Sequence, residues 1–477
     1  MVASLHLREA NLNYQPLHPP HPPASRMAQP EQIAQVPAAP PALSPADDEN
    51  VELFSAVLSD LDRDQLPLLA SAILRRLQSV HVTSDRTPTV GHPLYGSYHV
   101  LFPVAFDGGP RWLVKIPING TAEKWDELSA SALACEANTM RLLKRKISIP
   151  LPEVLDFSST TENTLRCPYI MMTFIDGFSL YDIWFEHQLT GASIDTTLSC
   201  RTRALDGVAS AMAQLGQFSF RAGGRLIFDD DGQPSDIGPI RQLDNKAMLD
   251  RWFIHKDPAD DPIYIEYPAS SDPKAYYTFM LDKHPEQKPI PKGLAMLLRL
   301  LISWIPEPSD IDPFVLAHPD FDIQNFLVSD EGELQGIIDW EGVAAVPRTL
   351  GNERYPAWLT RDWDPAMYGY TESMENGEEP EGVWEDSPET LTYYRRVYEG
   401  LIAKHCTGRK GSKPDTNLCR MSIVTESLFI AANDPACRND ILRKLVAKIW
   451  DVAGQGGPPD ITEIAEMLLK TTWRTGL

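Results

Sequence analysis

Two stretches in the first third of the chain show the alternation of apolar and polar residues that is typical of paired β-strands. Residues 98–106 and 111–116 are rich in β-branched and aromatic side chains, and the turn-forming sequence D-G-G-P at 107–110 separates them. This pattern predicts a β-hairpin. Over residues 123–146 the spacing of apolar residues changes to that of a helix. The apolar stripe of this helix is made by Leu128, Ala132, Cys135, Met140 and Leu143.

A further apolar run, residues 169–175, predicts a buried strand that stops at Asp176 and Gly177. Beyond this strand the pattern is mostly helical, with a strand-like interruption at residues 324–340. The order of these elements predicts an α+β protein, in which a strand-rich part precedes a mostly helical one.

Two boundaries divide the chain into residues 1–50, 51–175 and 176–477. The first segment is rich in proline and alanine, and we interpret it as a disordered leader because it cannot bury enough apolar surface to fold. It lacks the apolar core of a secretory signal, so a cytosolic location is expected. The scarcity of acidic residues before Asp47 leaves a mitochondrial location open.

The charge of the chain argues against one class of partner. The sequence has 43 Lys and Arg residues and 66 Asp and Glu residues, which gives a formal net charge of −23. A nucleic-acid-binding protein needs a basic surface to neutralise phosphates, so no nucleic-acid partner is expected. An acidic run at residues 371–386 is interpreted as a solvated surface loop.

Cysteine spacing and the length of the apolar runs argue against two further classes. The six cysteines form no C-x-x-C pair, so neither a zinc site nor a disulfide framework is expected, and the thiols are predicted to be reduced. No run reaches the roughly 18–20 apolar residues that cross a bilayer. The most apolar stretch, residues 294–305, contains Arg299 and predicts a buried helix. No heptad seam is visible, so no oligomeric state is predicted.

The residues with the clearest chemical pattern lie in segment 317–341, and they are His318, Asp320, Asn325 and Asp339. An aspartate can act as a base beside an acceptor hydroxyl, and an amide oxygen five residues later can reach a Mg²⁺ ion. The apolar runs F-L-V and G-I-I on either side of E-G-E-L predict a hairpin that returns Asp339 to the same metal. This is the spacing of the H-x-D-x-x-x-x-N loop of kinases and of the metal-binding aspartate that follows it.

The segment resembles the catalytic loop of the aminoglycoside phosphotransferase and choline kinase-like superfamily. It is most similar to fungal phosphotransferase-like proteins, through H-P-D-F-D-x-x-N-F and I-I-D-W. The resemblance implies a bilobal protein-kinase-like fold with a small antiparallel-sheet N-lobe, residues 51–175, and a large, mostly helical C-lobe, residues 176–477. It also implies that ATP and Mg²⁺ bind between the lobes and that the γ-phosphoryl group passes to a hydroxyl of a small molecule.

The resemblance assigns roles residue by residue. Asp320 matches the catalytic base, Asn325 and Asp339 match the metal ligands, and His318 matches a structural histidine of the loop. Two positions depart from the pattern. Pro319 stands where antibiotic kinases have glycine, and Asp322 stands where kinases often have a cation. With an acid there, another residue would have to supply positive charge to the transferring phosphate.

The same resemblance implies matching residues in the N-lobe. Lys115, in L-V-K-I-P, resembles the strand lysine that holds the α- and β-phosphates, and Glu136, on the following helix, resembles its partner. Glu127 on that helix is a rival for the partner, but A-C-E-A-N around Glu136 is more similar to the family pattern.

The remaining nucleotide contacts are weaker matches. Gly96 and Ser97 fit a turn that covers the phosphates, although the full G-x-G-x-x-G is missing and an ordinary hairpin turn is an equal alternative. Backbone groups of Thr173 and Ile175 would meet the adenine edge, if residues 169–177 enter the hinge between the lobes.

The acceptor and the class of enzyme have alternatives. Trp358, Trp363, Asp364 and Tyr368 could hold an amine or a sugar, or could simply pack a loop on the C-lobe. A protein kinase-like enzyme is one alternative, but no A-P-E follows Asp339 and Trp340-Glu341 replaces Phe-Gly. A catalytically silent nucleotide-binding scaffold is the other, and the irregular glycine turn keeps it open.

Overall fold

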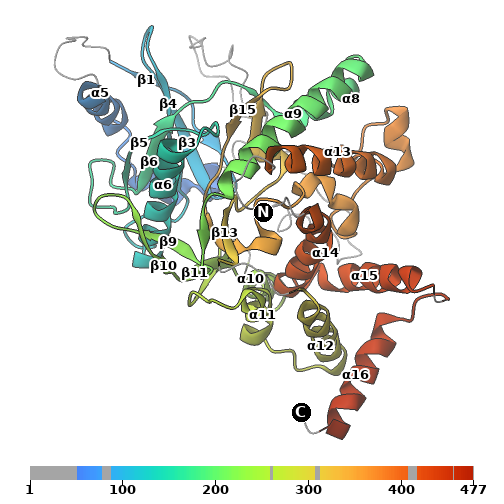
Figure 1. Ribbon diagram of the computed structural model, residues 1–477. Helices are drawn as coiled ribbons and strands as arrows, with labels where there is room; N and C mark the ends of the chain where they lie inside the picture. Colours follow the sequence, from blue (N-terminus) through green and yellow to red (C-terminus); the bar gives the residue numbers. More distant parts are fainter. Residues whose placement is uncertain are drawn as a thin grey trace.

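The chain was analysed in a computed structural model that describes residues 51–77, 87–257, 262–306, 312–406, 416–454 and 456–475. The predicted disordered leader lies outside these residues. The described part has a two-lobed, protein-kinase-like α+β fold, in which a small lobe built on an antiparallel sheet precedes a larger, mostly helical lobe (Figure 1). The predicted fold class is therefore confirmed.

The N-lobe is built around a six-stranded sheet. The strands run in the order β1-β3-β4-β6-β5, with β2 also paired to β3, and all of these pairs are antiparallel. Their bounds are β1 Thr89–Val90, β2 Leu94–Tyr95, β3 His99–Ala105, β4 Arg111–Pro117, β5 Val154–Ser158 and β6 Tyr169–Thr173. The predicted hairpin is β3–β4, in which the buried residues Phe102 and Val114 lie opposite each other. Helices α4 (Ser55–Asp60) and α5 (Gln65–Leu77) contribute apolar residues to the same core as these strands.

Helix α6 (Glu127–Lys146) links this sheet to the rest of the molecule. It begins four residues later than the pattern predicted, because the Asp126 side chain caps it by accepting from the Ser129 N–H at 2.7 Å. Leu128 was predicted on the apolar stripe but is 46 % exposed, and Leu133 occupies the buried face instead. The later members of the predicted stripe, from Cys135 onward, are buried as expected.

The C-lobe contains more strands than the sequence pattern predicted. Its helices are α7 Leu180–Trp184, α8 Glu186–Leu189, α9 Ile194–Leu215, α10 Asn245–Phe253, α11 Pro273–Lys283, α12 Pro289–Ser303, α13 Pro388–Cys406, α14 Thr416–Asn433, α15 Arg438–Val452 and α16 Ile461–Thr475. Its strands are β7 Phe178–Ser179, β8 Ser219–Phe220, β9 Arg225–Phe228, β10 Pro234–Gly238, β11 Ile240–Leu243, β12 Tyr264–Tyr267, β13 Phe314–Ala317, β14 Phe326–Val328, β15 Leu334–Ile337 and β16 Ala344–Pro347. Single-turn 3-10 helices are η1 Ile323–Asn325, η2 Arg348–Leu350, η3 Ala357–Leu359, η4 Arg361–Trp363 and η5 Glu372–Asn376.

Most of the missed strands are short and pair in small sheets. β9 pairs with β10, β11 with β12, and β13 lies between β16 and β8. Strands of two to five residues give too little alternation to be recognised from a sequence. The predicted interruption at 324–340 is the hairpin β14–β15, with β7 on the other side of β14.

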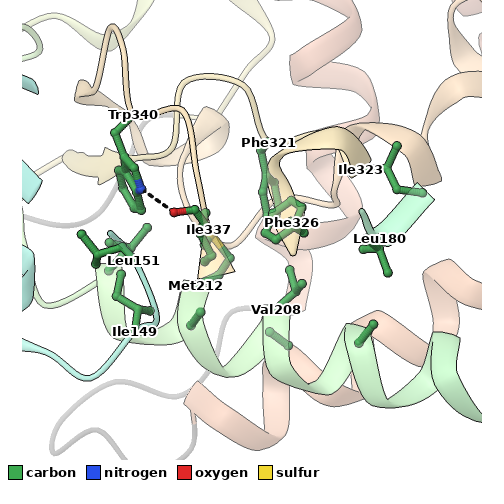
Figure 2. Close-up of a cluster of buried hydrophobic side chains, with 14 of the residues drawn as sticks. Ile149, Leu151, Leu180, Val208, Met212, Phe321, Ile323, Phe326, Ile337 and Trp340 are labelled. Carbon is green, nitrogen blue, oxygen red and sulfur yellow. Dashed lines mark hydrogen bonds between the residues drawn. The ribbon is translucent and has the colours of Figure 1, made fainter. Parts of the chain in front are cut away.

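A continuous apolar core joins the two lobes (Figure 2). Trp340 is fully buried in it, donates from Nε1 to the Ile337 carbonyl at 3.0 Å, and lies beside Ile149 and Leu151, which follow α6. Met212 of α9 lies on the same cluster from the C-lobe side. The segment that carries the candidate catalytic residues is therefore packed between the helices of both lobes.

The cysteines are buried, and the most apolar stretch of the chain forms a helix with one buried face. All six thiols are free and buried. The apolar run at 294–305 lies mainly in α12, whose buried face includes Leu294, Leu298 and Ile302. Among the described residues, no helix combines the length and apolar character that crossing a membrane requires.

Candidate active site

The ammonium group of Lys115 joins three distant segments of the chain. Its Nζ donates to Glu136 Oε1 on α6 at 2.8 Å and to Asp339 Oδ1, just after β15, at 3.2 Å. The side chains of Lys115 and Glu136 are only 8 % and 6 % exposed. Glu127, the rival partner, is exposed in the first turn of α6. The structure thus brings Lys115 together with Glu136 and not with Glu127.

Burial and mutual attraction set the protonation of these three groups. Burial alone would lower the pKa of Lys115, but the carboxylates of Glu136 and Asp339 outweigh it and raise that pKa above its ordinary value. Burial would raise the pKa of Asp339, but Lys115 outweighs it and holds the pKa low, so the carboxylate is ionised. Burial dominates at Glu136, whose pKa is raised although Lys115 opposes the shift.

The hairpin β14–β15 brings Asp339 back to the catalytic loop. The Ile338 N–H donates to the Asn325 carbonyl at 3.0 Å, so the residue that follows Ile338 lies close to Asn325. Asp339 itself has φ of +59°, a left-handed conformation that costs a non-glycine residue about 1–2 kcal/mol. Strain of this kind occurs most often at functional sites, where the surrounding structure maintains it.

Hydrogen bonds fix the orientation of Asp320. Its Oδ2 accepts from Gln324 Nε2 at 3.0 Å and from Asn325 Nδ2 at 2.9 Å, and the latter nitrogen also donates to the Asp320 carbonyl at 2.8 Å. The amide nitrogen of Asn325 is thereby committed to Asp320, and the amide oxygen is the atom left for a metal. Asp320 is half-buried, so its carboxylate can meet a ligand.

His318 has the surroundings of a structural residue. Its Nε2 lies 2.9 Å from the Ile338 carbonyl, and its ring centroid is 4.7 Å from that of Trp340. Burial lowers the pKa of His318, so the ring is neutral at physiological pH. These contacts tie the start of the catalytic loop to the segment that carries Asp339.

The donors present fit Mg²⁺ better than a metal that needs a cage of protein ligands. Within the described ranges, no group of three or more His, Cys, Asp or Glu side chains could hold a metal. Asn325 and Asp339 offer one amide oxygen and one carboxylate. Mg²⁺ typically takes one or two carboxylates from the protein and fills its octahedron with phosphate oxygens and water.

Gly96 and Ser97 lie in the turn between β2 and β3. The Gly96 N–H donates to the His99 carbonyl at 2.8 Å, and both turn residues are exposed. A Cβ on Gly96 would meet only the His99 carbonyl oxygen, at 3.5 Å, so nothing in the chain itself requires glycine there. The assignment of this turn to phosphate stays a prediction.

The strand that enters the hinge ends at Thr173, two residues earlier than predicted. The Thr173 N–H donates to the Glu153 carbonyl at 3.0 Å, and its Oγ1 accepts from the Glu153 N–H at 2.9 Å. This N–H is therefore used within the N-lobe sheet and is not free for adenine. Ile175 lies beyond the strand and next to Gly336 of β15. A Cβ added to Gly336 would lie only 2.7 Å from Ile175 Cδ1.

One functional candidate that the sequence did not reveal is Arg361. Its guanidinium forms an ion pair with the buried carboxylate of Asp322, two residues after Asp320. Asp322 is the main cause that raises the pKa of Arg361, and Asp320 acts in the same direction. Arg361 of η4 thus places a cation beside the loop, next to the acid at position 322. Arg361 and Asp322 are 39 residues apart, and no local pattern connects them.

A second missed pair lies on the other side of Lys115. His99 Nε2 is 3.5 Å from Glu341 Oε2. Burial, followed by the charge of Lys115, lowers the pKa of His99 to about 3, so the ring is neutral. Burial raises the pKa of Glu341 although Lys115 opposes the shift. Trp340 and Glu341, which depart from the protein-kinase pattern, thus have different surroundings. Trp340 is buried in the core, and Glu341 lines the cavity that contains Lys115.

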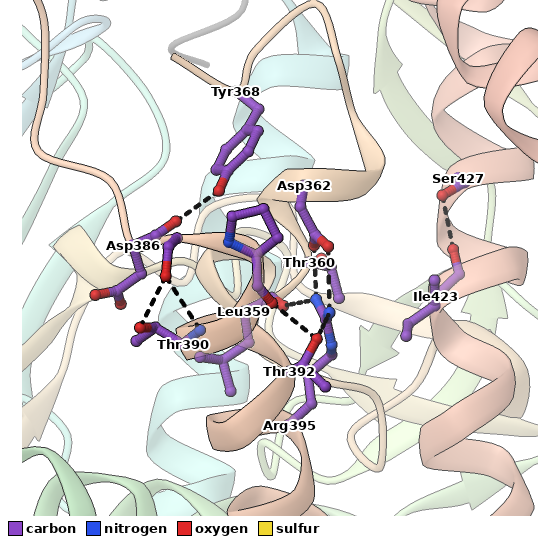
Figure 3. A network of polar contacts seen from close by, with 12 residues as sticks. Leu359, Thr360, Asp362, Tyr368, Asp386, Thr390, Thr392, Arg395, Ile423 and Ser427 are labelled. Atoms are coloured by element: carbon purple, nitrogen blue, oxygen red, sulfur yellow. Dashed lines mark hydrogen bonds and ion pairs between the residues drawn. The ribbon is translucent and has the colours of Figure 1, made fainter. Parts of the chain in front are cut away.

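Figure 3 shows a polar network that joins segment 357–392 to Arg395 of α13. The Ala357 N–H donates to the Phe321 carbonyl at 2.9 Å, which places this segment beside the loop that carries Asp320. Arg395 of α13 makes two bonds to the Asp362 carboxylate, at 2.6 and 3.2 Å, and one to the Leu359 carbonyl at 2.7 Å. The Tyr368 hydroxyl donates to the Asp386 carbonyl at 2.6 Å. A buried, charge-assisted network of this kind gives the segment one defined position.

Three of the four candidates for acceptor binding have ring contacts, and these are Trp358, Trp363 and Tyr368. Trp358 is buried, with its ring centroid 5.6 Å from that of Phe326 and 5.8 Å from that of Trp184. Lys444 lies 5.5 Å from the Trp363 ring. Packing therefore accounts for Trp358. Asp364 is partly buried, and desolvation raises its pKa to about 6.

The interpretation of residues 371–386 as a solvated loop is wrong at its end. Glu385 and Asp386 are buried, at 8 % and 9 % exposed. Asp386 accepts from Trp184 Nε1 at 2.6 Å and from Arg201 Nη1 at 3.0 Å. Charge counting could not separate these two acids from the exposed ones before them, because burial depends on tertiary packing and the partners of Asp386 come from α7 and α9.

Comparisons with known proteins identify the family of the chain. A family model described as "Phosphotransferase enzyme family" matches residues 104–349. The chain is 27 % identical over 161 residues to "Altered inheritance of mitochondria protein 9, mitochondrial" of Candida albicans, a match covering 33 % of this chain and 25 % of that protein. It is 23 % identical over 334 residues to a subtelomeric hrmA-associated cluster protein of Aspergillus fumigatus, covering 58 % and 62 % respectively. The chain thus spans less than two thirds of the length of these relatives.

One solved structure with a similar fold is Plasmodium vivax ethanolamine kinase. The two chains are 10 % identical, the match covers 92 % of this chain and 98 % of the other, and the TM-score is 0.39.

Proposed function

The chain belongs to the phosphotransferase enzyme family, and on that premise we propose that it transfers the γ-phosphoryl group of Mg-ATP to a hydroxyl of a small molecule. The observation that carries the proposal is the contact set of Lys115, whose Nζ meets Glu136 at 2.8 Å and Asp339 at 3.2 Å. Kinases use such a lysine, its acidic partner and a metal-binding aspartate to hold ATP. Three segments far apart in the sequence converge here on one ammonium group.

In the proposed complex, the residues around Lys115 bind different parts of Mg-ATP. Mg-ATP would supply the phosphoryl group and a divalent charge that offsets the charge of the phosphates. The Lys115 ammonium would hold the α- and β-phosphates, and Asn325 Oδ1 and the Asp339 carboxylate would bind the metal. Gly96, Ser97, Ile175 and the carbonyl group of Thr173, whose N–H is bonded within the sheet, are the proposed contacts to the rest of the nucleotide.

Asp320 is the proposed catalytic base. Gln324 and Asn325 both bind its Oδ2, so Oδ1 is the oxygen available to accept a hydrogen bond from the acceptor hydroxyl. As the acceptor oxygen bonds to the γ-phosphorus, the bond from that phosphorus to the bridging oxygen of ADP breaks, and Asp320 takes the hydroxyl proton. Positioning and electrostatic stabilisation supply most of the rate enhancement in such reactions.

Arg361 is the proposed source of positive charge beside the base. A guanidinium has five N–H donors, and the ion pair with Asp322 does not use all of them. The remaining donors would stabilise the charge that develops on the transferring phosphoryl group, as other enzymes do with an arginine.

The first test is label transfer from γ-labelled ATP, with Mg²⁺, into a fractionated cell extract. Asp320→Asn should lower transfer by about 10²–10⁴-fold, because the amide cannot take the proton, while binding of Mg-ATP is kept. Asp330→Asn is the matched control, since Asp330 is exposed in the β14–β15 turn, and it should transfer label like the wild type.

The fraction that carries the label decides between the candidate functions. Label in the small-molecule fraction supports the proposal and gives the acceptor to identify. Label in protein indicates the protein kinase-like alternative. Thermal stabilisation by Mg-ATP with equal label from the wild type and Asp320→Asn would indicate a silent nucleotide-binding scaffold.

A cytosolic location is part of the proposal, with mitochondria as the alternative. The name of the Candida albicans relative contains "mitochondrial", which supports the alternative. Fractionation of cells that express the full chain with a C-terminal tag distinguishes the two, because the tag should be recovered with a cytosolic or with a mitochondrial marker.

A further inference from the structure

Part of the C-lobe packs along the helix of the N-lobe that carries Glu136. Strands β9 to β12 and α10 lie between α9 and α11 in the sequence, and in space β9 lies against α6 (Figure 1). We call the described residues 225–257 and 262–267 the clamp segment. Because α6 belongs to the other lobe, these contacts fix the helix from outside its own sheet.

The main polar contact of the clamp segment is made by Arg241 of β11. Its Nη2 donates to Ser129 Oγ at 3.1 Å, and its guanidinium carbon lies 4.0 Å from the centroid of the Tyr264 ring on β12. Ser129 is only 3 % exposed. The Tyr264 ring fixes the plane of the guanidinium, so Arg241 meets the helix in one orientation.

Ser129 and Glu136 lie on the same face of α6. They are seven residues apart, which is about two turns of helix. Ser129, Glu136, Lys115 and Arg241 all line one cavity between α6 and β4. A rotation of α6 that moved Glu136 away from Lys115 would therefore also move Ser129 away from Arg241.

Two further contacts lie along the same helix. Leu226 of β9 is 2 % exposed and belongs to the same apolar cluster as Leu133 and Cys135. Nearer the end of α6, Arg145 Nη2 donates to the Gly232 carbonyl at 2.6 Å. Arg145 is exposed, so this bond contributes little. On the face of α6 that carries Glu136, the helix and the clamp segment are thus joined by the polar contact from Arg241 to Ser129.

We infer that Arg241 is a positioning residue of the phosphate-binding site, which holds α6 so that Glu136 stays bonded to Lys115. Arg241 acts through Ser129 and does not itself touch the nucleotide. The inference rests on the proposed function, since Lys115 is taken to hold the phosphates of ATP. It predicts that loss of the Arg241 contact weakens phosphate binding and leaves adenine binding unchanged.

The test compares the wild type with Arg241→Ala, Arg241→Lys and Ser129→Ala. Affinities for Mg-ATP and for adenosine, which lacks phosphates, are measured by calorimetry, and amide hydrogen exchange is followed across residues 127–136. Arg221→Ala is the matched control, because Arg221 precedes the clamp segment, has a side chain 84 % exposed and pairs with Asp312 at 3.7 Å.

Loss of one charge-assisted hydrogen bond should weaken Mg-ATP binding by about tenfold or somewhat more. We expect this in Arg241→Ala together with faster exchange in the first turns of α6, unchanged adenosine affinity and partial recovery in Arg241→Lys. Ser129→Ala should resemble Arg241→Ala, and combining the two should add little, since both remove the same bond.

Each contrary outcome has its own meaning. Unchanged exchange and unchanged Mg-ATP affinity in Arg241→Ala would overturn the inference, and so would faster exchange with unchanged Mg-ATP affinity, because the contact would then be structural only. A wild type that binds adenosine but gains nothing from the phosphates of Mg-ATP would instead overturn the proposed function. Ser129→Ala keeps the test decisive if Arg241→Ala fails to fold.

Discussion

The buried ion pair of Arg361 and Asp322 gives a way to separate stability from catalysis at single residues. Arg361→Met leaves the Asp322 carboxylate buried without its partner, which should cost about 3–5 kcal/mol of unfolding free energy. Arg361→Met combined with Asp322→Asn removes both charges and should restore most of that stability. If Arg361 stabilises the transferring phosphoryl group, the double variant should still transfer label at least tenfold more slowly than the wild type.

Urea unfolding and the label-transfer assay check these values on the same preparations. Asp322→Asn alone is the control, since it keeps the guanidinium. A double variant with wild-type transfer would contradict the role proposed for Arg361.

Glu385 gives the molecule a pH-dependent stability. Burial raises the pKa of Glu385 from 4.5 to about 8, although Arg361 opposes the shift. The folded state therefore binds this proton more tightly than the unfolded state. The resulting stabilisation is complete below pH 4.5 and is lost as pH rises to about 8.

Glu385→Gln cannot ionise and should escape that loss. The unfolding free energy of the variant minus that of the wild type should therefore increase between pH 5 and pH 8, by at most about 1.4 kcal/mol per pH unit. Chemical denaturation at several pH values measures the difference. Glu381→Gln, at an exposed position of the same segment, should show a flat difference, and a flat difference for Glu385→Gln would disprove the buried, protonated state.

From the spacing of residues alone, the sequence predicted only those site residues that lie in one short segment. His318, Asp320 and Asn325 are close in sequence, and the hairpin motif extends the pattern to Asp339. Lys115 and Glu136 depended on the family resemblance, because a single strand lysine or helix glutamate carries no local signal. Arg361 could not be predicted as a site residue, because it is placed beside the loop by its ion pair with Asp322, which is far away in sequence.

At the scale of elements, the β14–β15 hairpin depends on one glycine. Gly332 in its turn has φ of +83°, and a Cβ there would lie 2.5 Å from the carbonyl oxygen of Cys200 on α9. Gly332→Ala adds a steric clash with backbone to the cost of a left-handed alanine. We expect a loss of about 2–4 kcal/mol of unfolding free energy, with weaker Mg-ATP binding because Asp339 follows the hairpin.

Gly108→Ala separates the two costs. Gly108 also has a positive φ, of +57°, but a Cβ there would meet nothing within 4 Å. It should lose only about 1 kcal/mol, the conformational cost alone. Equal losses for the two variants in a denaturation experiment would show that the contact with Cys200 has no energetic weight.

The elements that the sequence predicted from periodicity alone are the long, regular ones. β3, β4 and α6 lie where alternation or helical spacing extends over several residues. The short strands β14 and β15 were predicted instead from the two apolar runs on either side of E-G-E-L. The strands of the clamp segment were missed because each has at most five residues and is largely half-exposed. Their positions depend on packing against α6, which is not visible in the local sequence.

For the whole molecule, the core around Trp340 makes the two lobes dependent on each other. The cluster of Trp340 contains residues from α6 and β6 of the N-lobe and from α9 and α13 of the C-lobe. Trp340→Ala should cost about 3–5 kcal/mol, and both lobes should lose protection together. Hydrogen exchange in β3–β4 and in α13, followed through urea unfolding, tests this.

An exposed tryptophan is the control for that experiment. Trp304 follows α12 and is 62 % exposed, so Trp304→Ala should change stability by no more than about 0.5 kcal/mol. Separate unfolding of the N-lobe and the C-lobe in Trp340→Ala would mean that the shared core does not couple them.

The six buried thiols have a chemical consequence of their own. Alkylating reagents attack the thiolate, and burial raises the pKa of five of these thiols, those of Cys135, Cys167, Cys200, Cys419 and Cys437. Each can be modified only when its surroundings open, and together they lie in α6, in the N-lobe before β6, in α9, in α14 and before α15. The order in which an alkylating reagent modifies these thiols would therefore show which part of the native molecule opens first.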